Sequence, residues 1–201
     1  MTDRPQAWLW AVMTDALDDI LEDSSRRLLQ AASDRRSPMH TPVVATADAD
    51  ARVMVLRAFT PWTLRFHTDI RAPKVAVIAG DPRVGVLFYD KAEKVQIRVR
   101  GRARVERDGA VADAAWAAGD NFARRCYLGE GPGSGVEAAS SGLPAAFEGR
   151  KPTDDELLPA RGNFAIMLVE LTELDWFSLS QDGHRRAQFD LASGTSRWVT
   201  P

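Results

Sequence analysis

Two cations stand at the beginning of a predicted helix within the stretch FHTDIRAPKVAVIAGDP, residues 66–82. Asp69 is placed to cap this helix, and Pro73 suits its first turn. Arg71 and Lys74 then face the positive end of the helix dipole, which costs roughly a few tenths of a kcal/mol each unless an anion lies between them. The spacing therefore predicts an anion-binding site at the start of this helix.

A second group of polar residues occurs in QIRVRGRARV, residues 96–105, where polar and apolar side chains alternate as in a half-buried strand. The polar face carries Gln96, Arg98, Arg100, Arg102 and Arg104. The first interpretation is a surface or subunit-facing stripe whose arginines pair with carboxylates. A nucleic-acid groove is disfavoured, because no aromatic residues are interleaved for base stacking. Gln96 differs from its neighbours, since an amide offers both donors and an acceptor to the edge of a heterocycle.

Further candidates lie in RVMVLR and just before the predicted helix. Strict alternation directs Arg52 and Arg57 to opposite faces of a strand, so they serve one pocket only if the strand bulges or the pocket wraps its end. His67 and Thr68 come close to the point that Lys74 would reach. A structural role is the more common one for a single histidine.

Composition narrows the classes of function. The 201 residues carry a net charge of −2, so no global attraction to nucleic acid or to acidic membranes is expected. Cys126 is the single cysteine, and no His or Cys residues have metal-ligand spacing, so neither a disulfide nor a metal site is expected. No export signal and no membrane-spanning run is visible, so a cytoplasmic location is predicted. No glycine-rich nucleotide-binding loop and no GxSxG hydrolase motif is visible, which disfavours the classical nucleotide-binding and hydrolase folds.

Periodicity predicts the helices and strands on which these residues lie. The sequence predicts an amphipathic helix at about residues 5–30, then short strands from residue 41 interrupted by the small helix. A helical segment at 109–128 and a Gly- and Ser-rich loop at 129–144 come before the closing strands. We expect one domain spanning residues 1–201, with an antiparallel β-barrel at about 41–200 flanked by helices.

The motifs together resemble a known family. Five motifs follow the order and spacing of the pyridoxamine 5'-phosphate oxidase family. They are RVMVLR at 52–57, FHTD at 66–69, Lys74, DPRV at 81–84 and QIRVRG at 96–101. The likeness is close from about residue 41 to 106 and looser afterwards, with RWVTP resembling the family's C-terminal ending. It implies an FMN-binding split β-barrel, in which the predicted anion is the phosphate of FMN.

The resemblance also implies roles for individual residues. It assigns Arg52, Lys74 and Thr68 to the FMN phosphate and Gln96 to the isoalloxazine ring. It implies an obligate homodimer in which Ser140 and Ser141 reach the partner's flavin. The full set implied to bind the cofactor is Arg52, Val53, Val55, Leu56, Arg57, His67, Thr68, Lys74, Gln96, Ser140 and Ser141.

The chain departs from the family at the substrate side. The oxidases carry an Arg-x-His segment near the C-terminus, where this chain has HRRAQF at 184–189. The substrate-binding candidates are Arg57, Arg124, Tyr127, Arg185 and Arg186. The resemblance implies an FMN-dependent oxidoreductase acting on a small organic substrate. A reductase using NAD(P)H or a deazaflavin, and a non-catalytic flavin- or haem-binding module, remain as alternatives, and no catalytic residue is predicted.

Overall fold

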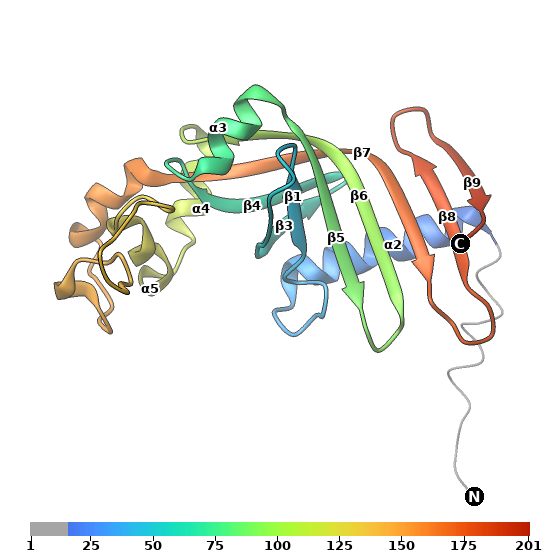
Figure 1. Ribbon diagram of the computed structural model, residues 1–201, viewed down its shortest axis with the longest axis horizontal. Coiled ribbons are helices and arrows are strands. Elements are labelled where there is room, and N and C mark those ends of the chain that lie inside the picture. The colour runs from blue at the N-terminus through green and yellow to red at the C-terminus, as the bar shows by residue number, and fades with distance from the viewer. Residues whose placement is uncertain (1–15) are drawn as a thin grey trace, which may run out of the picture.

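The computed structural model describes residues 16–201 and shows a strongly bent sheet with helices on its faces and at one end (Figure 1). The elements in chain order are α2 (Leu17–Ser33), β1 (Val43–Thr46), β2 (Ala51–Val53), β3 (Leu56–Thr60), β4 (Thr63–Asp69), α3 (Pro73–Gly80), β5 (Arg83–Asp90), β6 (Val95–Glu106), α4 (Ala110–Ala117), α5 (Asn121–Arg124), η1 (Arg125–Leu128), η2 (Ala145–Phe147), η3 (Asp155–Asn163), β7 (Phe164–Ser178), β8 (Arg185–Asp190) and β9 (Thr195–Val199).

All strand pairs are antiparallel, in the order β2-β1-β5-β6-β7-β4-β3, with β8 and β9 added beside β7. The long strands β6 and β7 form the spine, since β7 pairs with β6 and β4 and also with β8. The predicted antiparallel barrel flanked by helices is therefore confirmed.

The main core lies between the inner face of the sheet and α2. The buried face of this helix consists of Ile20, Ser24, Leu28 and Ala31, at the spacing expected for one helix face. The Ser24 hydroxyl donates to the Ile20 carbonyl at 2.8 Å, so its burial leaves no unpaired group. The predicted N-terminal helix thus ends at Ser33, and the part of it predicted before residue 16 lies outside the described residues.

A second, smaller core forms at the far end of β7. Phe164, Ile166 and Leu168 point away from the main core and pack with α4 and with Trp116 and Tyr127. The helical segment predicted at 109–128 is present but divided, because Asp120 caps a new helix through the Phe122 N–H. Residues 129–144 contain no helix or strand, as the composition predicts. None of the helices in residues 16–201 is both long and apolar enough to cross a membrane.

The stretch RVMVLR at 52–57, treated as one strand from the sequence, is divided between two strands in the structure. β2 ends at Val53 and β3 begins at Leu56 because the chain between them bonds to the preceding segment: Met54 N–H donates to Pro42 at 3.0 Å, and Leu56 N–H donates to His40 at 2.9 Å. The register with β4 then shifts between Leu56 and Ala58. Arg57 is consequently the extra residue of a β-bulge, the arrangement that frees it from strict alternation.

Candidate functional site

The helix predicted to begin near Asp69 is present, but Asp69 does not cap it. α3 begins at Pro73 after Ala72, with no side-chain cap. The Asp69 carboxylate instead accepts hydrogen bonds from the Arg71 N–H at 2.8 Å and from its guanidinium at 2.9 and 2.7 Å. This prediction was wrong because an arginine two residues away offers the nearly buried carboxylate a stronger, charge-assisted partner than a helix amide does. Arg71 is therefore neutralised and is not a free cation.

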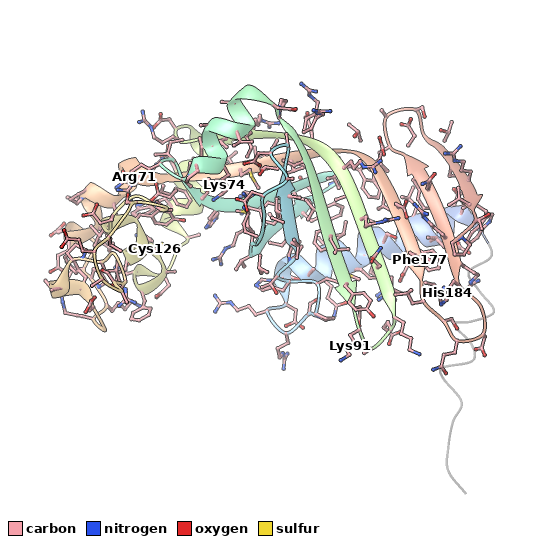
Figure 2. All side chains as sticks on the ribbon, viewed as in Figure 1. Arg71, Lys74, Lys91, Cys126, Phe177 and His184 are labelled. Carbon is pink, nitrogen blue, oxygen red and sulfur yellow. The ribbon has the colours of Figure 1, made fainter. Side chains whose placement is uncertain are left out.

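Lys74 remains the unpaired cation at this helix start. Within residues 16–201 it forms no hydrogen bond or ion pair, although its side chain is half-buried. Burial lowers the pKa of Lys74, and the neighbouring Arg52 lowers it further, while Asp69 and Asp50 act in the opposite direction. Figure 2 shows Lys74 below α3 and beside β1. The ammonium thus lies at the positive end of a helix dipole and near a second cation, which is a favourable place for a bound anion.

Arg52 reaches this point from β2. Its guanidinium donates to the Thr46 hydroxyl at 2.9 Å and binds the Asp50 carboxylate. These contacts hold the arginine on the inner face of the edge strand, where it lowers the pKa of Lys74. The structure therefore brings Arg52 and Lys74 together, as the sequence predicts.

Thr68 and His67 occupy opposite faces of β4. Thr68 is buried on the same face as Phe66, and its hydroxyl contacts the Asp69 carbonyl at 3.3 Å. His67 points to the other face, where its ring meets Phe164 edge-on at 4.9 Å between centroids. The proximity of Lys74 and the His67 side chain, expected from the sequence, is therefore not found.

His67 instead lies close to Arg57 and Arg65. Burial lowers the pKa of His67 to about 4, and the charges of Arg57 and Arg65 act in the same direction. Tyr127 packs against Phe164 at 5.2 Å between ring centroids, and burial raises the pKa of the Tyr127 phenol. Arg57 is near both His67 and Tyr127, whereas Arg52 is near Lys74. The two arginines of RVMVLR therefore lie at different places.

Gln96 lies elsewhere on the sheet. It pairs with Tyr89 and Phe177 on the outer face of β6, beside the β5–β6 turn. α3 ends at the other end of this strand, where the Ala103 N–H donates to Pro82 at 2.7 Å. Seven residues of strand separate Gln96 from Ala103, about 23 Å at roughly 3.3 Å per residue. Gln96 and the end of α3 therefore lie at opposite ends of β6.

The remaining substrate candidates are distributed over both ends of the molecule (Figure 1). Arg124 donates to the carbonyls of Ala117 and Gly119 and lies over Trp116 at 5.2 Å, so it closes the end of α4. Arg186 lies on β8 at the opposite end and binds Asp175 at 2.7 Å. Its neighbour Arg185 is half-buried on the same strand.

Ser140 and Ser141 make local contacts within the predicted loop. The Ser140 hydroxyl accepts from the Gly142 N–H at 3.0 Å, and the Ser141 hydroxyl donates to Glu148 at 2.6 Å. The base of the loop is joined to the turn just before α3, because Arg71 donates to the Gly129 carbonyl at 3.0 Å. Both serines are exposed, so they are accessible to a second molecule.

The outer face of the sheet contains a groove of about 820 Å³ that the sequence did not predict. Six of the residues that line it lie opposite one another in a single row: Val43, Leu87, Arg98, Asp175, Gln188 and Arg197. Arg98 binds Asp175 at 2.9 Å, Gln188 donates to Asp175 at 3.1 Å, and Arg197 donates to Gln188 at 3.0 Å.

The arginine stripe of β6 is thus largely paired with carboxylates, as its first interpretation predicts. Arg100 binds Glu173 at 2.9 Å and Arg104 binds Glu106 at 2.7 Å, in addition to the pair of Arg98. The alternation of polar and apolar residues in β6 predicted that this face of the strand is positively charged. The partners on β7 to β9 could not be predicted, because they depend on the register between strands distant in sequence.

Comparisons with known proteins bear on the family and the fold. Residues 21–107 match the model of a family described as "Pyridoxamine 5'-phosphate oxidase, FMN-binding domain". That segment contains Arg52, Thr68, Lys74 and Gln96, and the predicted resemblance to this family is confirmed over it. A search of curated proteins gave no match.

Solved structures share the fold over most of the chain. A pyridoxamine 5'-phosphate oxidase-related, FMN-binding protein from Nostoc punctiforme is 22% identical with a TM-score of 0.65, and the match covers 94% of this chain and 99% of that one. PhzG from Burkholderia lata, in complex with tetrahydrophenazine-1-carboxylic acid, is 15% identical with a TM-score of 0.63, covering 100% and 98%. A protein from Clostridium acetobutylicum related to general stress protein 26 is 9% identical with a TM-score of 0.57, covering 89% and 100%. The chain has the FMN-binding split-barrel fold.

Proposed function

We propose that this protein binds FMN and acts as an oxidoreductase on a small organic substrate. The observation that carries the cofactor assignment is the half-buried, unpaired ammonium of Lys74 at the start of α3, near Arg52. A phosphate dianion suits this place, because it would relieve the repulsion between the two cations and would lie at the positive end of the helix dipole. Bound FMN would supply hydride or electron transfer at its isoalloxazine ring.

The chain's own residues would hold the phosphate and orient the ring. Lys74 and Arg52 would bind the phosphate oxygens, with the Thr68 hydroxyl as a further partner. Gln96 would offer its amide to the ring edge, and Ser140 and Ser141 would contribute from the loop. We assign no proton transfer to a particular side chain.

A homodimer is part of the same proposal. The resemblance to the family implies two chains at each flavin, with Ser140 and Ser141 of one chain reaching the cofactor of its partner. The outer face that carries Gln96 also exposes Val53 (64%), Leu87 (37%) and Tyr89 (42%), which a partner would cover. A stable monomer that still binds FMN in sedimentation experiments would contradict this part.

The cofactor proposal is tested by calorimetry with FMN and riboflavin. We expect FMN to bind at least about tenfold more tightly, because a charge-assisted phosphate contact contributes about 1.5–3 kcal/mol. Equal affinities would remove the phosphate site from the proposal.

The substrate is tested separately on the FMN-loaded protein. Turnover with pyridoxine phosphate or pyridoxamine phosphate would define an oxidase, and turnover with NADPH would define a reductase. Because PhzG was solved with a tetrahydrophenazine carboxylic acid, partly reduced aromatic acids are a further class to assay. Binding of FMN with no turnover of any of these would favour a non-catalytic flavin-binding module.

A further inference from the structure

A threonine hydroxyl is buried on the core-facing side of β1, next to the proposed phosphate site. Val44 and Thr46 are two residues apart and point to the same face of the strand, where they are 0% and 5% exposed. Val84, which lies opposite Thr46 on β5, is also buried. A hydroxyl in such apolar surroundings costs stability unless it is hydrogen-bonded, and a valine would avoid that cost. The Thr46 hydroxyl therefore requires a specific explanation.

The contacts of Thr46 fix the direction of its hydroxyl group. The hydroxyl donates to the Asp48 carboxylate at 2.7 Å and accepts from the Arg52 guanidinium at 2.9 Å. The hydrogen bond from Thr46 is the main cause that lowers the pKa of Asp48, so this carboxylate is ionised at neutral pH and can only accept. The hydroxyl proton consequently points to Asp48, and a lone pair of the oxygen faces Arg52.

Arg52 has two partners within residues 16–201, and they differ in burial. Thr46 is buried, whereas the Asp50 side chain is 65% exposed. An exposed ion pair contributes little, because water screens the charges and solvates both groups. Thr46 is therefore the fixed anchor of the guanidinium, and Asp50 is a partner that another anion can replace.

The anchor leaves most of the guanidinium available to a ligand. An arginine has five N–H donors, and the two contacts of Arg52 use one hydrogen on each terminal nitrogen. The Nε hydrogen and the second hydrogen of each terminal nitrogen remain, and the side chain is 22% exposed. Arg52 also lies near enough to Lys74 to lower the pKa of its ammonium. Arg52 can thus share an anion with Lys74 while it keeps its bond to Thr46.

We propose that Thr46 is a positioning residue for the phosphate of FMN, which holds the Arg52 guanidinium in the orientation that binds the phosphate without contacting the cofactor itself. Asp50 occupies the same guanidinium until the phosphate replaces it. An arginine that is fixed before the ligand arrives loses less conformational freedom on binding, so the anchor adds affinity for the phosphate and none for the flavin ring. The inference rests on the proposed function, because it concerns the same site.

The proposal is tested by calorimetric titration of Thr46→Val with FMN and, separately, with riboflavin. We expect the affinity for FMN to fall about three- to tenfold, less than on loss of a direct phosphate contact. The affinity for riboflavin, which lacks the phosphate, should not change. Thr46→Ser retains the hydroxyl and should bind FMN like the wild type. Thr195→Val is the matched control, since its exposed hydroxyl contacts that of Ser193 at 2.9 Å beside β9, and it should change neither affinity.

A double-mutant cycle with Arg52→Met separates positioning from a general effect on the fold. If Thr46 acts through Arg52, Thr46→Val weakens FMN binding in the wild-type background and has no further effect in the Arg52→Met background. Asp50→Asn should bind FMN at least as tightly as the wild type, because it removes a competitor for the guanidinium. Thermal melts of the FMN-free variants check folding, and Thr46→Val should remain folded because valine suits a core-facing strand position. If it melts too low to titrate, Thr46→Ala gives the same comparison.

Three results would overturn the proposal. They are an unchanged FMN affinity in Thr46→Val, an equal loss of affinity for FMN and riboflavin, or additive effects of Thr46→Val and Arg52→Met. A weaker affinity for FMN in Asp50→Asn would likewise show that Asp50, and not Thr46, holds the arginine. Failure of the proposed phosphate site gives a different result, since Lys74→Ala would then also leave the FMN affinity unchanged. Loss of FMN affinity in Lys74→Ala but not in Thr46→Val would reject the anchor alone.

Discussion

Lys74 and Arg52 approach each other from α3 and β2, and the presence of Arg52 lowers the pKa of Lys74. Arg52 has a carboxylate partner in Asp50, whereas Lys74 has none within residues 16–201. Two cations that repel each other in the absence of ligand contribute to binding when an anion lies between them. Substitution of Lys74 should therefore weaken FMN binding but should not lower the stability of the FMN-free protein.

Lys74→Ala should weaken FMN about ten- to hundredfold, the loss of one charge-assisted contact of about 1.5–3 kcal/mol. The melting temperature of the FMN-free protein should stay level or rise slightly, because a cation is removed from the positive end of a helix dipole. Calorimetry and thermal melts check both effects. Lys91→Ala, in the exposed β5–β6 turn (Figure 2), is the control and should change neither. Unchanged FMN affinity in Lys74→Ala would move the phosphate site elsewhere.

Arg71→Gln should destabilise the fold and loosen the loop at 129–144. Asp69 is 8% exposed, and substitution removes its guanidinium partner at a cost of about 1–3 kcal/mol. It also removes the hydrogen bond to Gly129, so limited proteolysis should cut the loop faster. Arg83 binds Asp81 with the same spacing on the surface, where solvent screening leaves such a pair contributing little to stability. Equal destabilisation by Arg71→Gln and Arg83→Gln would show that burial of Asp69 is unimportant.

His67 should make the stability of the fold depend on pH between about 6.5 and about 4. Its pKa falls from 6.5 to about 4 on folding, so in this window the unfolded chain binds a proton that the folded chain does not. Stability therefore falls as the pH is lowered through this window, by about 1–3 kcal/mol after allowance for partial exposure. Denaturation at pH 7 and pH 4.5 should show a smaller loss in His67→Phe than in the wild type. A His67 ring signal that titrates near pH 6.5 in NMR would contradict the prediction.

Gly101→Ala should disrupt the sheet where β6 and β7 change register. A Cβ at Gly101 would lie 2.1 Å from the Glu170 carbonyl oxygen, and the backbone of β7 cannot move aside without breaking its pairing. We expect a loss of at least about 3 kcal/mol, or failure to fold, because overpacking against backbone is costlier than the usual 1–3 kcal/mol. Gly85→Ala on β5 meets nothing within 4 Å and should change the melting temperature little. Similar melting temperatures for the two variants would refute the close approach.

The sequence predicted the local elements well where one face of an element is apolar. β5 and β6 match the alternating runs RVGVLFYD and VQIRVRGRARVE, and a helix with Pro73 in its first turn is present as predicted, although Ala72 and not Asp69 precedes it. Periodicity suffices there because the main core selects one face of each strand. The break after Val53 was missed, since it depends on hydrogen bonds from Met54 and Leu56 to a segment with no periodicity of its own.

The chemically competent residues and their order can be read from the amino-acid chain alone: Lys74 at a helix start, Arg52 upstream, and Gln96 on a polar strand face. Which of these residues meet depends on how the strands pair in the fold. It pairs Arg71 with Asp69, leaves Lys74 unpaired near Arg52, turns His67 toward Arg57 and Arg65, and keeps Gln96 at the far end of β6. The physical reason is that strand register, a bulge and competition for counterions are settled between segments distant in sequence, whereas propensity and periodicity act within a few residues.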